Sequence, residues 1–139
     1  MDTLELLLMQ NARFYEAFEQ ADMDTMTAVW SHDAQVRCIH PGWGAATGWE
    51  SVRKSWESIF SGGTALRFSL RNVDARVCGT FGVVSLLEEI VLAGEVVQQS
   101  IQAAATNLFA FEAGEWRMIV HHSSPVMTVE EGDLGYRFN

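Results

Sequence analysis

The sequence predicts one domain of the α+β class, with helices packed on one face of a curved antiparallel sheet. The first half of the chain carries apolar residues at helical spacing, interrupted by one short strand-like segment. The second half consists of long alternating or β-branched runs, separated by short segments that contain glycine. A length of 139 residues is typical of a single domain.

Two helices are expected before the first strand. Residues 3–20 form the longer one, because apolar side chains recur three and four positions apart. The apolar stripe consists of Leu4, Leu7, Leu8, Ala12, Tyr15 and either Phe18 or Glu19. Because Leu8, Asn11, Phe14 and Phe18 also lie close together on one side, the face is wide enough to lie across a sheet. A shorter helix follows within residues 20–30, where Asp22 or Asp24 can cap the first turn. The apolar side of this second helix consists of Met26, Val29 and Trp30.

One strand and a third helix come next. The segment AQVRCIHP, residues 34–41, is predicted to be a strand that stops at a Pro-Gly pair. Because side chains alternate across a strand, Val36, Cys38 and His40 share one face. A helix is then expected over residues 49–60, and a pair of glycines ends it.

Four long strands complete the predicted fold. The short segments GTFG, AGE and EAGE have the composition of hairpin connections, so neighbouring strands are expected to be antiparallel. The strands are predicted at residues 65–78, 81–92, 96–111 and 115–122.

Composition and charge restrict the possible functions. A net charge of −9 with scattered basic residues argues against nucleic-acid binding and against binding to anionic membranes. Cys38 and Cys78 lie in predicted strands and show no metal-binding spacing, which predicts free thiols. The sequence shows neither a signal-peptide pattern nor an apolar run long enough to span a membrane. We therefore expect a cytoplasmic protein, with residues 127–139 as a C-terminal tail.

Two long phrases of the sequence resemble a known superfamily. The phrase from ARFYEAF to WESVRKSW, which contains CIHPGW, is similar to the first half of SnoaL-like and ketosteroid-isomerase-like members of the NTF2-like superfamily. The phrase AATNLFAFEAGEWRMIVHHSSP is similar to their last hairpin. The resemblance covers about residues 4–126. It implies three helices packed on a strongly curved mixed or antiparallel sheet, a cone that encloses an apolar cavity.

The resemblance also indicates which catalytic positions differ from those of the steroid isomerases. The family's helix tyrosine falls on Phe14, and the adjacent Tyr15 is expected to point about 100° away. The family's base falls on Cys38 or His40, and its strand acid falls on Asn107. The steroid-isomerase residues are therefore not retained, and no cavity carboxylate is expected at the matching positions.

The resemblance leaves three candidate catalytic residues, which are His40, Asn107 and His121. His40 is a candidate acid or base, because the ordinary pKa of histidine lies near neutral pH. Asn107 is expected to form a hydrogen bond with His40 or with a buried water. The pair Glu88 and Glu89 is interpreted as partly solvent-facing and without an acid–base role.

The last strand carries two adjacent histidines. By the family alignment, Ile119, His121 and Ser123 face the cavity, so His122 faces the other side of the sheet. A metal site that combines these histidines with His40 is geometrically awkward, and no metal is expected.

Aromatic residues dominate the predicted cavity wall. Asn107, Phe109 and Phe111 are expected to share one face of their strand. Trp43 lies in a glycine-rich loop that suits the rim of a pocket or a lid. The predicted ligand-binding residues are Phe14, Phe18, Trp30, Cys38, Trp43, Trp56, Phe109 and Ser123.

Two classes of function remain open from these observations. One is a cofactor-independent isomerase or cyclase that acts on a small apolar molecule through acid–base catalysis. The other is a non-catalytic module that binds such a ligand or supports assembly. In both cases a homodimer is expected through the outer face of the strands at 81–92 and 96–111.

Overall fold

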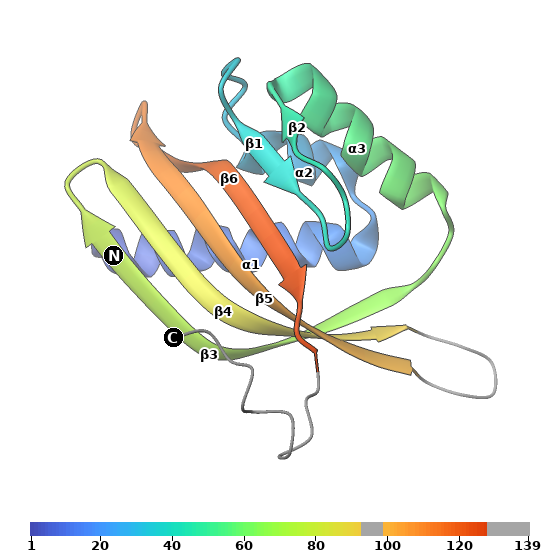
Figure 1. Ribbon diagram of the computed structural model, residues 1–139. Coiled ribbons are helices and arrows are strands. Elements are labelled where there is room, and N and C mark those ends of the chain that lie inside the picture. The colour runs from blue at the N-terminus through green and yellow to red at the C-terminus, as the bar shows by residue number, and fades with distance from the viewer. Residues whose placement is uncertain (93–98, 128–139) are drawn as a thin grey trace, which may run out of the picture.

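The computed structural model describes residues 1–92 and 99–127 and shows the predicted α+β architecture (Figure 1). Three helices pack on a six-stranded sheet; they are α1 (Thr3–Gln20), α2 (Met23–Val29) and α3 (Trp49–Ser61). The strands are β1 (Arg37–Ile39), β2 (Ala46–Thr47), β3 (Leu66–Cys78), β4 (Phe81–Leu92), β5 (Gln99–Glu112) and β6 (Glu115–Pro125). The AGE connection, the predicted strand residues 96–98 and the tail beyond residue 127 lie outside the described residues.

The sheet is mixed, with the strand order β2-β1-β6-β5-β4-β3. Strands β3 to β6 form the expected antiparallel meander. The short strand β1 pairs parallel with β6, so Cys38 lies beside His121. The two-residue strand β2 was not predicted, because a segment this short carries no detectable alternation.

The two N-terminal helices begin at acidic caps. Asp2 and Glu5 form a capping box at the start of α1, and Asp22 caps α2. The middle of α1 lies against the sheet, but Leu4, Leu8 and Ala12 are exposed. The predicted apolar face is therefore wrong at these three positions.

Irregularities bend two of the long strands. In β3 the register shifts between Arg71 and Asp74, where Asn72 has a φ of 53°. In β6 the register shifts so that Phe109 pairs with Met118 while Leu108 pairs with Val120, which leaves Ile119 as a bulged residue. Bulges of this kind increase the local twist and bend of a sheet.

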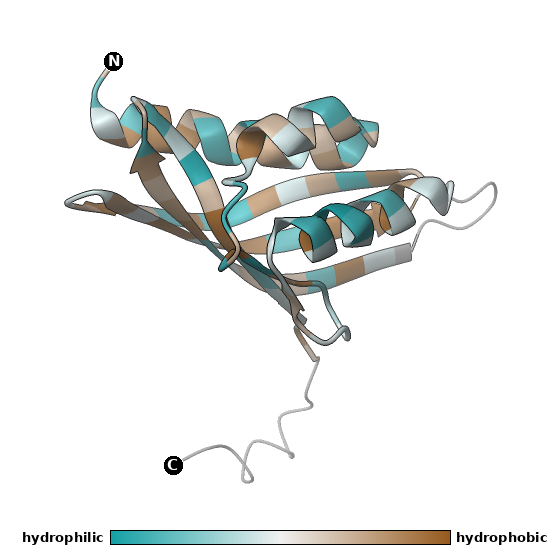
Figure 2. Ribbon diagram, turned by 90° about the horizontal axis from the view of Figure 1, so that it is seen from above, coloured by the Kyte–Doolittle hydropathy of each residue, from teal (hydrophilic) through white to brown (hydrophobic). Residues whose placement is uncertain are grey.

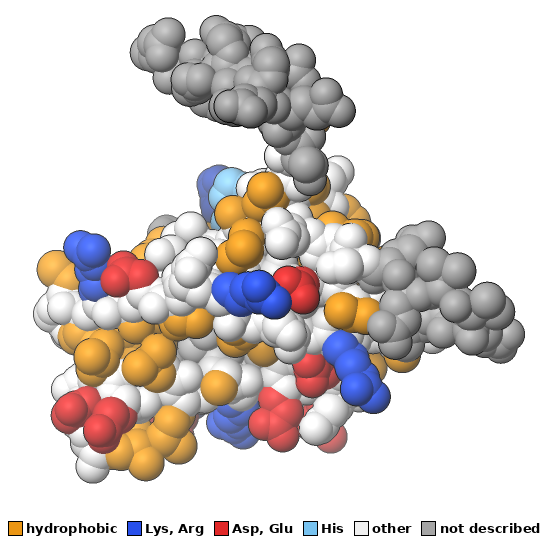
Figure 3. All heavy atoms as spheres, turned by 90° about the horizontal axis from the view of Figure 1, so that it is seen from below, with side chains coloured by type: hydrophobic (Ala, Val, Ile, Leu, Met, Phe, Trp, Pro, Cys, Tyr) orange, Lys and Arg blue, Asp and Glu red, His pale blue; other side chains and the backbone are white. Residues whose placement is uncertain are grey.

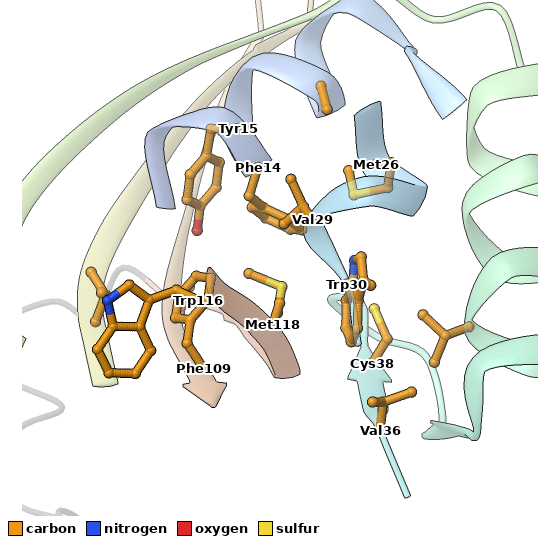
Figure 4. Packing of buried hydrophobic residues seen from close by; sticks show 14 of the residues in the cluster. Phe14, Tyr15, Met26, Val29, Trp30, Val36, Cys38, Phe109, Trp116 and Met118 are labelled. Carbon is orange, nitrogen blue, oxygen red and sulfur yellow. The ribbon is translucent and has the colours of Figure 1, made fainter. Parts of the chain in front are cut away.

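The core lies between the helices and the inner face of the sheet, as the buried side chains in Figure 4 show. Helix α1 approaches β4 closely at Gly82, where a Cβ atom would lie 2.8 Å from both methyl groups of Leu7. Along the helices, hydrophilic and hydrophobic residues alternate, as expected for elements with one solvated face (Figure 2).

The surface seen in Figure 3 carries hydrophobic side chains between scattered basic and acidic ones. On the outer side of the sheet, Val83, Leu87 and Leu108 are only half-buried. Among the helices of the described residues, none is long and apolar enough to cross a membrane.

Candidate functional site

A set of polar side chains lies deep on the inner face of the sheet, surrounded by the apolar core. They come from α1, β4, β5 and β6 and are all buried. We call this set the polar network, and it consists of Asn11, Tyr15, Glu88, Asn107, His121 and Ser123.

Glu88 is the acidic residue of the polar network. Its side chain is 1% exposed, and it accepts hydrogen bonds of 2.6 Å from the Tyr15 hydroxyl and of 2.6 Å from the Ser123 hydroxyl. Among the described residues no basic side chain pairs with it, whereas Glu89 points outward to Arg71. Burial raises the pKa of the Glu88 carboxyl, although the two hydroxyls oppose the shift. Only one of the two neighbouring carboxyls is buried, as expected, because strand alternation turns Glu88 inward and Glu89 outward.

Tyr15 also lies inside, as expected for the apolar face of α1, although it was not expected to reach the site because it is turned about 100° from Phe14 along the helix. Phe14 and Tyr15 are both buried, because α1 lies within the concave face of the sheet and covers a wide sector. Phe14 packs against Trp56 and His121, while Tyr15 reaches Glu88. Burial raises the pKa of the Tyr15 hydroxyl further above its usual value, and the nearby Glu88 adds to this effect.

Asn107 connects the two halves of the polar network. Its amide nitrogen donates to Asn11 Oδ1 at 2.9 Å and to the Tyr15 hydroxyl at 3.1 Å, and its carbonyl oxygen lies 2.6 Å from His121 Nδ1. The predicted partners, His40 or a buried water, are therefore replaced by three protein groups. Asn107 faces inward as predicted, but its partners come from α1 and β6.

The two adjacent histidines of β6 lie on opposite faces, as predicted: His121 is 1% exposed, whereas His122 is exposed. Burial, together with smaller contributions from the charges of His40 and His122, lowers the pKa of His121 to about 3. His121 is therefore neutral at pH 7. The inward position expected for Ile119 is taken by Met118, because the bulge shifts the alternation; Ile119 is half-buried against the core.

His40 lies at the end of β1 in a separate polar contact. Its Nε2 is 3.1 Å from Ser55 Oγ on α3, and Ser55 Oγ donates to the Val52 carbonyl. Burial lowers the pKa of His40 to about 4, so this imidazole is also neutral at pH 7. Cys38 Sγ lies 3.4 Å from His40 Nε2, and burial raises the pKa of the Cys38 thiol, which disfavours the reactive thiolate.

Trp56 of α3 lies at the centre of a cluster of rings, which we call the ring cluster. Its ring centroid is 4.7 Å from His40, 4.8 Å from Phe18 and 6.0 Å from His121. The other members are Phe14 and Phe60. The indole nitrogen of Trp56 is buried without a hydrogen-bond partner in the described structure, and so is that of Trp30.

A cavity of about 310 Å³ opens beside the ring cluster, between α1, α3 and the paired ends of β3 and β4. We call it the α1–α3 cavity. Its apolar lining comes mainly from Phe18, Ile59, Phe60, Leu66 and Leu92. Further hollows of about 250 and 480 Å³ lie on the other side of α1 and contain none of the predicted site residues.

The predicted ligand-binding residues fall into two groups in the structure. Phe18 lines the α1–α3 cavity, and Trp43 is 48% exposed above His40, with 4.9 Å between their ring centroids. All six others are buried in the packed interior, namely Phe14, Trp30, Cys38, Trp56, Phe109 and Ser123. Phe111, which was expected to face inward, is 37% exposed and packs edge-on against Trp116 near the hairpin end. The role of these residues in ligand binding stays a prediction.

Glu88, Tyr15, Asn11 and Ser55 were not among the predicted site residues. Glu88 had a detectable signal, since it is a carboxylate in strict alternation with Val84 and Leu86, both buried. Tyr15 and Ser55 had none, because both depend on how α1 and α3 sit against the sheet. Within residues 1–92 and 99–127 no group of three or more histidine, cysteine or acidic side chains is arranged to hold a metal ion.

Comparison with known proteins identifies the family to which the chain belongs. Residues 8–128 match the model of the SnoaL-like domain. The structure is similar to a proposed dehydratase of the NTF2-like family from Streptomyces avermitilis, with 28% identity and a TM-score of 0.83 over 89% of this chain and 97% of that one. It is also similar to a proposed calcium/calmodulin-dependent protein kinase type II association domain from Thiobacillus denitrificans. There the identity is 31% and the TM-score 0.74, over 85% of this chain and 93% of that one.

A curated plant protein is also similar. The F-box protein SKIP8 of Arabidopsis thaliana is 25% identical over 129 residues, which is 93% of this chain. The chain spans about half, 53%, of the length of that relative. The predicted resemblance to NTF2-like and SnoaL-like proteins is confirmed by the family match and by the neighbouring structures.

Proposed function

Because the chain belongs to the SnoaL-like domain family, we propose that it binds a small, mainly apolar organic molecule at the α1–α3 cavity and exchanges a proton with it through Glu88. Fold alone does not decide between enzymes and binding modules, so the proposal depends on the residues of the site. It keeps the predicted apolar ligand and the predicted acid–base chemistry. It moves the proton-transferring group from His40 to Glu88.

The observation that carries the proposal is the environment of Glu88. A carboxyl group buried without a cation destabilises a folded protein, because its charge is taken out of water. Glu88 is 1% exposed and is held only by the hydroxyls of Tyr15 and Ser123. A raised pKa brings a carboxyl closer to the pH at which it can both accept and release a proton. Groups in such environments are concentrated at functional sites.

The α1–α3 cavity provides the approach to this carboxyl. Phe68 of β3 packs against Phe18 at 4.6 Å and against Tyr15 at 5.4 Å. Phe18 lines the cavity, so two aromatic rings separate it from the Tyr15 hydroxyl. We propose that a ligand displaces the side chains of Phe18 and Phe68 and lies against Tyr15 and Glu88. Asn107 and His121 would orient Tyr15 from behind through their hydrogen bonds.

The similar protein from Streptomyces avermitilis supports this class of chemistry. It is a proposed dehydratase, and loss of water from an organic substrate requires one proton to be removed and another to be delivered. With 28% identity, the likeness supports a reaction class and not a substrate.

The proposal can be tested with ketones whose α-protons exchange slowly. We expect the protein to accelerate deuterium uptake from D2O by 1-tetralone or cyclohex-3-enone, followed by proton NMR. Glu88→Gln keeps the shape of the side chain and should lower the rate at least tenfold. Glu89→Gln removes the neighbouring outward carboxyl and is the matched control, with an unchanged rate. Absence of acceleration with both ketones, or an unaffected Glu88→Gln variant, would contradict the proposal.

A non-catalytic assembly module is the second candidate. The outer sides of β4 and β5 carry Val83, Leu87 and Leu108 in a half-buried state, with Val83 paired opposite Leu108. The similarity to an association domain favours the same class. We propose that a second copy of the chain covers this face, so that Leu87→Lys yields a monomer. Light scattering after size-exclusion chromatography measures this, and a monomeric wild-type protein at micromolar concentration would exclude the homodimer.

A further inference from the structure

Two side-chain nitrogens of buried residues in the ring cluster, Trp56 Nε1 and His121 Nε2, form no hydrogen bond among the described residues, and their chemical characters are opposite. Trp56 Nε1 carries a proton and can only donate a hydrogen bond, and it has no partner in the described structure. The neighbouring ring of His121 uses only Nδ1, and no partner of its Nε2 is found among residues 1–92 and 99–127. Buried polar groups are nearly always paired, so an unpaired donor beside an unpaired acceptor requires an explanation.

The tautomer of His121 follows from the polar network. An ionised Glu88 can only accept, so the Tyr15 hydroxyl donates to it and must accept from Asn107. The amide nitrogen of Asn107 therefore faces Tyr15 and Asn11, and its carbonyl oxygen faces His121. His121 must then carry its proton on Nδ1. Because the imidazole is neutral, its Nε2 keeps a free lone pair.

The two unpaired atoms belong to adjacent rings. The ring centroids of Trp56 and His121 are 6.0 Å apart, and both side chains are almost completely buried. Phe18 packs against Trp56 at 4.8 Å and also lines the α1–α3 cavity, so a single aromatic ring separates Trp56 from that cavity. Trp30 provides a contrast, because its indole nitrogen is equally unpaired but it is not among the rings that pack on His121.

We propose that the ligand of the α1–α3 cavity carries a hydroxyl group that accepts a hydrogen bond from Trp56 Nε1 and donates one to His121 Nε2. A hydroxyl is the smallest organic group that is both donor and acceptor, and it satisfies both atoms at once. A keto oxygen would leave His121 unpaired, and an ammonium group would leave Trp56 unpaired. The inference rests on the proposed binding of an organic molecule at this cavity and adds its chemical class, an apolar molecule with a hydroxyl group.

Matched probes test the inference without any turnover. We expect 2-naphthol to bind the wild-type protein at least tenfold more tightly than 2-methylnaphthalene, which corresponds to about 1.4 kcal/mol. The comparison is conservative, because the methyl analogue is the more hydrophobic of the two. Fluorescence titration of each probe gives the two dissociation constants. Equal affinities, or tighter binding of the methyl analogue, would overturn the inference.

Single substitutions then locate the hydroxyl. Trp56→Phe and His121→Phe remove the donor and the acceptor while keeping a ring, so each should reduce the preference for 2-naphthol towards one. Trp49→Phe on the same helix is the matched control and should keep it, since Trp49 stacks on His32 outside the ring cluster. Circular dichroism checks that each variant is folded. If a variant does not fold, the relative affinity of the wild-type protein for 2-naphthol and 2-methylnaphthalene still tests the inference. A preference that persists in Trp56→Phe, or a crystal structure with 2-naphthol elsewhere and only water between the two rings, would overturn the inference.

Failure of the proposed function and failure of this inference are distinguishable. If both probes bind the wild-type protein equally at the α1–α3 cavity, the cavity binds ligands but the hydroxyl inference is wrong. If neither probe binds, the proposed ligand site and the inference both fail. Loss of proton exchange in Glu88→Gln has no influence on this outcome, because the titration measures affinity alone.

Discussion

On the inner face of the sheet, the polar network around Glu88 and the ring cluster around Trp56 meet at His121 but use their hydrogen-bonding atoms differently. In the polar network, the side chains of Glu88 and Asn107 form hydrogen bonds of 2.6–3.1 Å with four protein side chains. In the ring cluster, the indole nitrogen of Trp56 has none. Hydrogen-bonded groups stabilise one arrangement of the core, whereas an unpaired donor is available to a ligand. The comparison predicts that changes in the network affect stability and that changes in the cluster affect binding.

The largest expected effect comes from acidification, which acts on both regions through their histidines. Burial lowers the pKa of His40 to about 4 and that of His121 to about 3, whereas each titrates near 6.5 when unfolded. Below pH 6.5 the unfolded chain therefore binds more protons, and stability falls as the pH falls. At pH 5 each histidine should remove about 2 kcal/mol relative to its contribution at neutral pH.

Urea unfolding at pH 7 and pH 5 measures this loss. Because the pKa of Glu88 is raised, its carboxyl has the opposite effect on the pH dependence, and the comparison is best made in a Glu88→Gln background. The further changes His40→Gln and His121→Gln should each flatten the pH dependence. An unchanged slope in both variants would show that the imidazoles are not buried as neutral groups.

The next largest effect is expected for Asn107→Leu, which removes the centre of the polar network. The substitution leaves Asn11 Oδ1 and His121 Nδ1 without a partner in the described structure and removes one of the two hydrogen bonds of the Tyr15 hydroxyl. Each unpaired buried group costs about 1–3 kcal/mol, so the total loss should be about 3 kcal/mol or more. Thr106→Ala, at the exposed neighbouring position, should change stability by less than about 0.5 kcal/mol. Equal effects of the two changes in urea unfolding would contradict the comparison.

A smaller effect is expected for Tyr15→Phe at the edge of the network. The change removes the hydroxyl that donates to Glu88 and accepts from Asn107, but the ring still packs against Phe14 and Phe68. The expected loss is about 1–2 kcal/mol, measured by thermal or urea unfolding. With one donor fewer for its charge, Glu88 should also titrate at higher pH, which carboxyl-carbon NMR can follow. A Glu88 pKa that stays the same or falls would be inconsistent with this hydrogen bond.

The smallest effect on stability is expected for Trp56→Phe in the ring cluster. Because Trp56 Nε1 has no partner, its removal breaks no hydrogen bond, and only the change in ring size contributes. Trp116→Phe is the informative comparison, since Trp116 Nε1 donates to the Thr3 carbonyl at 3.0 Å. We expect Trp116→Phe to cost about 1 kcal/mol more than Trp56→Phe in urea unfolding. The reverse order would mean that Trp56 has a partner in solution.

The sequence predicted the architecture well because periodicity and glycine positions carry that information. The bounds of α1 and the two adjacent histidines on opposite faces of β6 followed from spacing alone. The parallel pairing of β1 with β6 and the strand β2 did not, because both join segments that are distant in sequence or too short to show a pattern.

The site was predicted less completely than the fold. Asn107 and His121 were identified as inward-facing polar residues, but their partners were not. Tyr15 was discarded because helical geometry separates it from Phe14 by about 100°. The concave sheet buries both sectors of α1, and this depends on sheet curvature, which no local pattern reports.

The bulge at Ile119 has a consequence for how β6 tolerates changes of alignment. Counted in steps of two from Trp116, the inward positions would include His122; the extra residue at the bulge transfers that place to His121. A register without the bulge would thus bring the neighbouring imidazole opposite Asn107. Because two histidines follow one another, an imidazole faces the interior at this point of β6 whether or not the bulge is present.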